Sequence, residues 1–253
     1  MPTSLEVLFT PAEFQALAAR DLSRTVCVVF DVFRATSTIV TALAHGATAV
    51  IPVAEIPEAL ALRKSRPDVL LAGEREGLRI RANLTGGIDF DLGNSPREFT
   101  AARVQGRTIV LSTTNGSRAL RACACAQAIL VGSFLNLRAT ADYLHANSFP
   151  NVLLVCSGTH NEAAYEDVLG AGALADLLWP RFADGHIADS ARMALQIYQQ
   201  NSRDLSGAVQ YSGNGRRLSS MPDLRDDIAW CLKRDAFPLI AKMEQDSIKK
   251  LVA

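Results

Sequence analysis

Seven short apolar runs, separated by segments with helical spacing, constrain the fold more than any other feature of this chain. Each run is six residues long and rich in Val, Ile and Leu. They occupy residues 4–9, 25–30, 48–53, 68–73, 107–112, 127–132 and 151–156. Near-continuous apolar content is typical of strands that are covered on both faces, so the runs predict a buried, largely parallel sheet.

The segments between these runs have apolar residues at three- and four-residue spacing, which predicts helices. They cover residues 11–20, 37–46, 56–65, 115–124 and 137–147. Alternating strands and helices predict a three-layer α/β/α sandwich around a mostly parallel sheet that can include antiparallel strands. The chain of 253 residues shows no clear linker or internal repeat. It predicts one α/β domain over 1–253, mainly helical from about residue 160.

The charge balance excludes a large basic surface. Lys and Arg together number 26, as do Asp and Glu, so the net charge is zero. We therefore expect no nucleic-acid partner and no membrane partner, and any anion must be recognised locally. No apolar run reaches transmembrane length, the first residues do not resemble a signal peptide, and the five cysteines include no CxxC pair. This pattern predicts a cytoplasmic protein, and the apolar composition permits a homodimer.

Polar residues concentrate where the predicted strands end. Asp31 and Arg34 follow the second run, and Glu74 and Arg75 follow the fourth. The same pattern recurs after the fifth and seventh runs, with Thr113, Thr114, Asn115, Gly116, Ser157 and Gly158. Ligands bind at the carboxyl ends of strands in open α/β sheets, so these residues predict a ligand site.

The residue types at these strand ends suit an anion. Arg34, Arg75, Arg79 and Arg118 could match phosphate oxygens with their guanidinium groups, and the starts of the following helices could add N–H donors. Asp31 and Arg34 could instead form a structural salt bridge. A functional role is the preferred interpretation, because Glu74 and Arg75 repeat the arrangement at another strand end.

Further acids occur at 162, 166 and 167. Adjacent acids on a helix usually form a solvated face, but Tyr165 and Val168 flank this pair and indicate that the turn is partly buried. Carboxylates beside a phosphate site are expected where Mg²⁺ bridges the two.

One alternative is a nucleotide-dependent oxidoreductase. "GAGALA" (170–175) matches a G-x-G-x-x-A pattern. It begins 14 residues after the apolar run at 151–156 rather than in its first turn, so small residues for tight helix packing are the preferred interpretation. A phospho-aspartate loop also fits poorly, because Phe33 stands where such loops carry a second acid.

Several motifs together resemble a known family. They are "FDVFRATSTIVTALAHGATAVIPV" (30–53), "GEREGL" (73–78), "FDLGNSP" (90–96), "LSTTNGSRAL" (111–120) and "YEDVLGAG" (165–172). Their order is similar to that of the 2-phosphosulfolactate phosphatases, the ComB family of coenzyme M biosynthesis. The resemblance extends over roughly residues 25–240, although the link at 79–88 looks longer than usual.

The resemblance implies a Mg²⁺-dependent phosphatase that converts 2-phospho-3-sulfolactate, or a similar small anionic phosphate, to sulfolactate and phosphate. Asp31 would either bind the metal or attack phosphorus. A non-catalytic anion-binding relative is the remaining alternative, but all four motif acids are present. The implied catalytic residues are Asp31, Arg34, Glu74 and Arg75, and the implied metal ligands are Asp31, Glu74, Glu166 and Asp167. The implied substrate-binding residues are Ser37, Asn94, Ser95, Thr113, Thr114, Asn115, Gly116 and Arg118.

Overall fold

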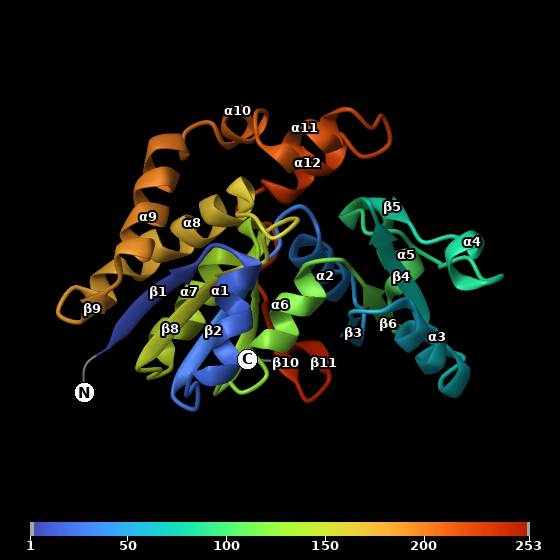
Figure 1. The fold of residues 1–253 in the computed structure, drawn as a ribbon, viewed down its shortest axis with the longest axis horizontal. Coiled ribbons are helices and arrows are strands. Elements are labelled where there is room, and N and C mark those ends of the chain that lie inside the picture. Colours follow the sequence, from blue (N-terminus) through green and yellow to red (C-terminus); the bar gives the residue numbers. More distant parts are fainter. Residues whose placement is uncertain (1–2, 252–253) are drawn as a thin grey trace.

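All seven apolar runs form strands in the computed structural model, which describes residues 3–251. Each strand begins within two residues of its predicted start (Figure 1). These strands are β1 (Ser4–Leu8), β2 (Thr25–Phe30), β3 (Ala49–Val53), β4 (Leu70–Arg75), β6 (Thr108–Ser112), β7 (Ala128–Gly132) and β8 (Asn151–Cys156). Four short or C-terminal strands are added to them: β5 (Leu78–Arg79), β9 (His186–Ile187), β10 (Ile240–Glu244) and β11 (Ser247–Leu251).

The described strands form one mixed, mostly parallel sheet of eleven strands. Their order is β5-β4-β6-β3-β11-β10-β7-β2-β8-β1-β9. Strands β7, β2, β8 and β1 are parallel to one another, and so are β3, β6 and β4. The β10–β11 hairpin lies between the two groups and pairs antiparallel with β7 and β3. The predicted fold class is therefore confirmed. The antiparallel β10–β11 hairpin lies in the middle of the sheet, and β5 pairs antiparallel with β4 at one edge.

Helices connect the strands at the positions that the spacing predicts, and more follow toward the C-terminus. The first group is α1 (Pro11–Gln15), α2 (Ala35–Ala44), α3 (Ile56–Ser65), α4 (Ala82–Thr85), α5 (Ala101–Val104), α6 (Gly116–Ala122) and α7 (Leu137–Ala146). The second group is α8 (Tyr165–Phe182), α9 (Asp189–Asn201), α10 (Leu205–Val209), α11 (Gly213–Ser219) and α12 (Asp226–Cys231). Short 3₁₀ turns occur at η1 (Ala16–Ala19), η2 (Pro96–Glu98) and η3 (Phe134–Asn136).

Both faces of the sheet are buried, as β2 shows. Val26, Val28 and Phe30 belong to a core cluster that includes residues of α7 and α8. Cys27 and Val29 belong to a second cluster, with residues of α1, α2 and α6. Successive side chains of a strand point to opposite faces, so the two clusters lie on either side of the sheet. This double burial explains why the strand sequences are continuously apolar rather than alternating.

The C-terminal part is mainly helical from α8 to α12, as predicted, but it ends in a β-hairpin that the sequence analysis did not predict. Strands β10 and β11 carry charged residues such as Lys242 and Lys249, and they gain most of their order from pairing with β7 and β3. The Gly- and Ser-rich stretch at 211–223 contains α11. Ser212 caps that helix by accepting a hydrogen bond from the backbone N–H of Gly215 at 3.0 Å.

The "GAGALA" segment lies in the middle of α8, so the nucleotide-loop interpretation is wrong. A Cβ atom on Gly170 would lie 2.9 Å from Phe30 Cδ1, and one on Gly172 would lie 2.7 Å from Tyr198 Cβ and would also collide with the carbonyl oxygen of Ala194. Here the small residues allow α8 to approach β2 and α9 closely, which confirms the packing interpretation.

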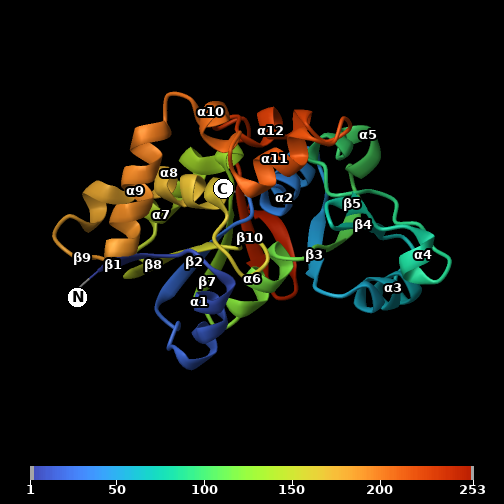
Figure 2. The same ribbon diagram turned by 45° about the horizontal axis from the view of Figure 1, so that its top comes forward.

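The C-terminal helices position the other side of the site. Figure 2 shows α11 and α12 crossing above the sheet, between the α8 side and the β4–β5 side. They therefore lie over the carboxyl ends of β2 and β4. Within the part of the chain that the structure describes, no helix is both long and apolar enough to cross a membrane.

The close contact at Gly172 generates a stability prediction. We expect Gly172→Ala to lower the free energy of unfolding by about 1–3 kcal/mol, because the backbone of α9 must shift to admit the methyl group. Urea denaturation measures this change. Gly213→Ala is the control, since a Cβ there meets no atom within 4 Å. Equal stability of the two variants would show that Gly172 does not set the spacing of α8 and α9.

Candidate active site

A cavity of about 1050 Å³ lies at the carboxyl ends of β2, β4 and β6. Its floor is formed by strand-end residues, and its walls come from the β4–β5 hairpin with α4 on one side and from residues 217–224 on the other. The side chains that line it include Asp31, Glu74, Asn94, Thr114, Asn115 and Arg217. The sheet thus brings together residues from three strand ends, as the sequence predicts.

Asp31 lies at the turn between β2 and α2. Its Oδ1 accepts a hydrogen bond from the N–H of Ala35 at 3.1 Å, and its own N–H donates to Thr36 Oγ1 at 3.1 Å. Burial, reinforced by the negative charge of Glu74, raises the pKa of Asp31 from about 3.8 to about 6. The ionised form of Asp31 is therefore disfavoured by burial and by a neighbouring negative charge, so a nearby cation would stabilise it.

Glu74 lies near the end of β4 and connects two loops. Its Oε1 accepts hydrogen bonds from the N–H and the hydroxyl of Thr114, both at 3.0 Å. Its Oε2 accepts one from the N–H of Gly77 at 2.8 Å. The side chain thus ties the turn after β6 to the β4–β5 hairpin while it lines the cavity beside Asp31.

The acids of α8 are buried, so the interpretation of a solvated face is wrong. Asp167 Oδ1 accepts a hydrogen bond from the N–H of Val32 at 2.8 Å, and Oδ2 accepts one from Ser157 Oγ at 3.1 Å. Burial and then the negative charge of Asp31 raise the pKa of Asp167 well above its ordinary value. Burial also raises the pKa of Glu166, which accepts a 2.6 Å hydrogen bond from Asn214 Nδ2.

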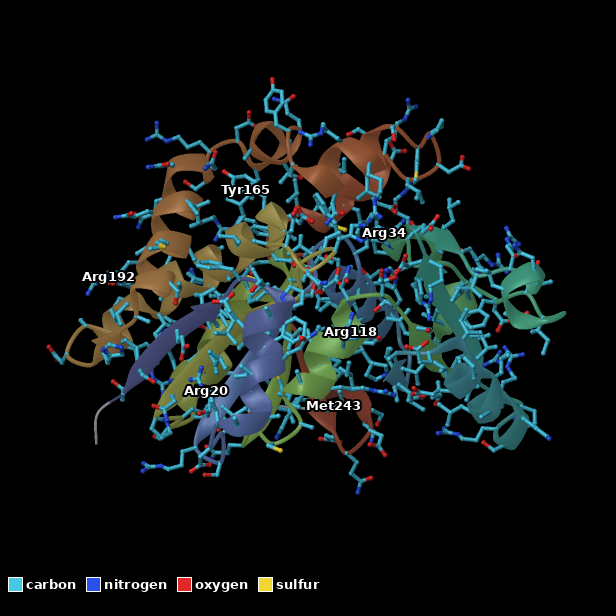
Figure 3. All side chains as sticks on the ribbon, viewed as in Figure 1. Arg20, Arg34, Arg118, Tyr165, Arg192 and Met243 are labelled. Carbon is cyan, nitrogen blue, oxygen red and sulfur yellow. The ribbon has the colours of Figure 1, made fainter. Side chains whose placement is uncertain are left out.

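Arg34 forms a buried ion pair with Asp227 rather than with Asp31. Its Nη1 lies 2.9 Å from Asp227 Oδ2, and the two side chains are 3% and 0% exposed. Arg34 Nη2 donates to the carbonyl of Gly77 at 2.6 Å, and Ser95 Oγ donates to Asp227 Oδ1 at 2.6 Å. Figure 3 shows Arg34 at the end of the sheet, beneath the C-terminal helices. The alternative of an Asp31–Arg34 salt bridge is therefore wrong.

Two other predicted arginines are placed differently. Arg75 lines the cavity, but its guanidinium donates to the carbonyls of Glu74 and Ala54 and to Ser112 Oγ, at 2.7, 3.0 and 3.0 Å. Arg118 is exposed on α6 and is not among the residues that line the cavity (Figure 3). Arg75 is thus bound to the protein itself, and Arg118 lies outside the site.

The remaining predicted substrate residues fall into two groups. Thr114, Asn115 and Asn94 line the cavity, and Asn94 is buried with an Oδ1 that receives no hydrogen bond within residues 3–251. The others are buried and support the turns. Thr113 Oγ1 accepts the N–H of Ser117 at 3.2 Å, and Ser37 Oγ donates to the carbonyl of Val32 at 2.9 Å.

Several N–H groups at the helix starts around Asp31 donate to acceptors within the protein. The N–H of Thr36 donates to the carbonyl of Asp31 at 2.9 Å, and the N–H of Arg118 donates to that of Asn115 at 3.0 Å. Gly116 packs against Asp31, where a Cβ atom would lie 2.7 Å from Oδ2. These bonded N–H groups are not free for an anion, and anion binding by the other N–H groups at the helix starts stays a prediction.

The site offers carboxylate oxygens, which are the type of ligand that Mg²⁺ prefers. Asp31 and Glu74 line the main cavity, Glu166 lines an adjacent cavity of about 390 Å³, and Asp167 lines neither. Among the described residues, no three His, Cys, Asp or Glu side chains are placed to share one ion. Mg²⁺ does not need three, because it usually takes one or two carboxylates together with waters and phosphate oxygens. The pair Asp31 and Glu74 meets this requirement.

Sequence reasoning did not identify Asp227, Asn214, Arg217 or His160, which also line or support the two cavities. Asp227 begins α12 beside Asp226, where acids commonly complement the start of a helix. Nothing local distinguishes a buried acid from its exposed neighbour at such a position.

Comparison with known proteins gives a consistent result. A family model described as "2-phosphosulpholactate phosphatase" matches residues 10–246. A probable 2-phosphosulfolactate phosphatase of Caldanaerobacter subterraneus subsp. tengcongensis is 36% identical over 244 residues, which cover 96% of this chain and 97% of the relative. A protein of the same description from Thermotoga maritima is 38% identical over 213 residues, covering 84% and 86%.

The raised pKa of Asp31 generates a prediction about stability and pH. The folded protein binds this proton more tightly than the unfolded chain, so the free energy of unfolding should fall as the pH rises from about 4 through about 6. Asp31→Asn removes the titrating group. Its stability relative to the wild type should grow by about 3 kcal/mol between about pH 4 and pH 8, measured by urea denaturation in EDTA. A difference that does not change with pH would contradict the assignment.

The buried ion pair generates a second prediction. Asp227→Asn leaves the Arg34 charge buried without its partner, so we expect a loss of about 3–5 kcal/mol in the free energy of unfolding. Asp226→Asn is the matched control, because Asp226 is exposed and lies 3.5 Å from Arg97 at the surface. We expect that change to cost less than about 1 kcal/mol. Equal losses in the two variants would show that the Arg34 pair is not essential to stability.

Proposed function

The chain belongs to the 2-phosphosulfolactate phosphatase family, and we propose that it is a Mg²⁺-dependent enzyme that hydrolyses 2-phospho-3-sulfolactate or a similar small anionic phosphomonoester. The observation that carries this proposal is the pair of carboxylates, Asp31 and Glu74, that lines a cavity at the carboxyl ends of β2 and β4. Family membership supports the reaction type, and a cavity of about 1050 Å³ has room for the substrate.

Asp31 and Glu74 are the residues that would hold the metal. When bound, Mg²⁺ neutralises charge on the phosphoryl oxygens and so lowers the barrier to attack on phosphorus. Asp167 and Glu166 lie behind Asp31 and add negative charge, which the raised pKa values reflect. The four buried acids together attract a cation. Without a cation, their mutual repulsion would destabilise the folded protein.

The protein's own groups fix the reacting geometry. Hydrogen bonds from Ala35 and Thr114 hold the Asp31 and Glu74 carboxylates, so neither must reorganise when substrate binds. The buried Oδ1 of Asn94 can accept a hydrogen bond from a water molecule or a ligand hydroxyl. In the reaction, the oxygen of a water molecule forms a bond to phosphorus and the water gives up a proton. The bond between phosphorus and the ester oxygen of the substrate breaks, and the ester oxygen takes up a proton.

Asp31 is assigned to the metal rather than to attack on phosphorus. Phospho-aspartate loops carry a second acid two residues after the nucleophile, and here Phe33 occupies that position and lines the cavity. Phosphate monoester hydrolysis is among the slowest uncatalysed reactions, so neutralising charge is the main requirement at this site.

Phosphate release from 2-phosphosulfolactate tests the proposal. We expect turnover with Mg²⁺ and loss of turnover in excess EDTA. Asp31→Asn should reduce kcat by about a hundredfold or more, because a charge interaction in the transition state is lost. Asp142→Asn is the control, since Asp142 is exposed on α7 and lines neither cavity. Full activity in EDTA would refute the metal, and full activity of Asp31→Asn would refute the role of Asp31.

A further inference from the structure

Arg217 on α11 has no carboxylate partner among the described residues. Its side chain lines the main cavity and the adjacent smaller one. Its Nε is buried and has no hydrogen-bond partner, and its guanidinium forms no ion pair within residues 3–251. Buried donors in folded proteins are nearly always satisfied, so this N–H requires an acceptor that the chain itself does not supply.

The other arginines of the main cavity do not share this property. Arg34 is paired with Asp227, Arg75 donates to backbone carbonyls, and Arg79 donates from Nε to the carbonyl of Phe90 at 2.5 Å. Arg81 donates to Asp89 at 3.1 Å. Among the described arginines that line this cavity, Arg217 is the one whose guanidinium is free for a ligand.

Two further arginines have a buried nitrogen without a partner, yet neither resembles Arg217. Arg63 forms an ion pair with Asp91, and Arg181 donates to the carbonyls of Asn147 and Phe149. In both cases another nitrogen of the same guanidinium is satisfied by the protein. At Arg217, by contrast, no nitrogen of the guanidinium has an acceptor among residues 3–251. This difference favours a ligand site over an unpaired surface arginine.

Arg217 also lies close to the catalytic floor. A Cβ atom on Gly77 would be 3.8 Å from Arg217 Cζ and 3.9 Å from Arg34 Nη2. The Gly77 N–H in turn donates to Glu74. The Arg217 guanidinium therefore lies near the part of the cavity that Asp31 and Glu74 line. Helix α11, which carries Arg217, belongs to the C-terminal part of the chain (Figure 2).

We propose that Arg217 binds the oxyanion on the organic part of the substrate, its sulfonate or carboxylate, and so selects phosphomonoesters that carry a second acidic group. This inference rests on the proposed function and extends it to substrate choice. The phosphoryl group belongs beside Asp31 and Glu74, where the metal would lie. A second anion on the same small molecule needs its own positive partner, and a guanidinium fork matches sulfonate or carboxylate oxygens.

The test compares Arg217→Gln, Arg217→Lys and the wild type on two substrates. For 2-phosphosulfolactate we expect the KM of Arg217→Gln to rise about tenfold to a hundredfold, as a charge-assisted hydrogen bond is lost. For 4-nitrophenyl phosphate, which has no second acid, KM should stay within about twofold. Arg217→Lys keeps the charge without the fork, so it should restore part of the loss. Arg203→Gln is the control, because Arg203 is exposed and lines neither cavity.

A binding measurement separates this inference from the proposed reaction. Calorimetry with 3-sulfolactate needs no turnover, and Arg217→Gln should weaken its binding by the same factor while binding of inorganic phosphate is unchanged. Isethionate and lactate then tell whether sulfonate or carboxylate is the partner. Equal weakening of sulfolactate and phosphate, no weakening of either, or no binding of sulfolactate to the wild type overturns the role of Arg217. Sulfolactate binding at Arg217 without phosphate release would refute the phosphatase and leave this inference standing.

Discussion

The buried ion pair of Arg34 with Asp227 is the interaction on which the rest of the site depends. It joins the end of β2 to α12, which is 193 residues away along the chain, and through the Gly77 carbonyl it also holds the β4–β5 hairpin. A charge that is buried without its partner is costly, so each group fixes the position of the other. The ion pair therefore fixes the positions of both cavity walls relative to the floor. Through it, the C-terminal helices form part of the site.

Three buried acids in and around the site oppose folding. Asp31, Glu166 and Asp167 are buried near one another, and their pKa values are raised. Backbone N–H groups and hydroxyls partly offset this cost by donating to the carboxylates. Clusters of this kind are expected at functional sites. A bound cation would be attracted to each carboxylate and would offset the repulsion between them.

The predictable part of the fold and site followed from local patterns and from one rule about sheets. Continuous apolar runs marked seven strands because both faces of the sheet are covered. Asp31 and Glu74 could be predicted as site residues because each lies at the carboxyl end of an apolar strand. That they share one cavity could not be predicted, because three antiparallel pairings separate the group of β2 from the group of β4, so the two groups run in opposite directions. The hairpin of β10 and β11 was missed because its charged, half-exposed residues form strands only when β3 and β7 supply partners.

The sequence by itself determined the α/β class, the family and the strand ends that carry the polar residues of the site, since these depend on periodicity and on residue type at strand ends. Only the tertiary structure decided what each charged group does. Arg34 reads in the sequence as a neighbour of Asp31, yet its guanidinium turns to Asp227. Arg75 is bound to carbonyls, whereas the buried Nε of Arg217 has no acceptor among residues 3–251. Hydrogen-bond and charge partners are chosen by proximity in space, and a linear pattern does not encode which distant residue will arrive beside a given guanidinium.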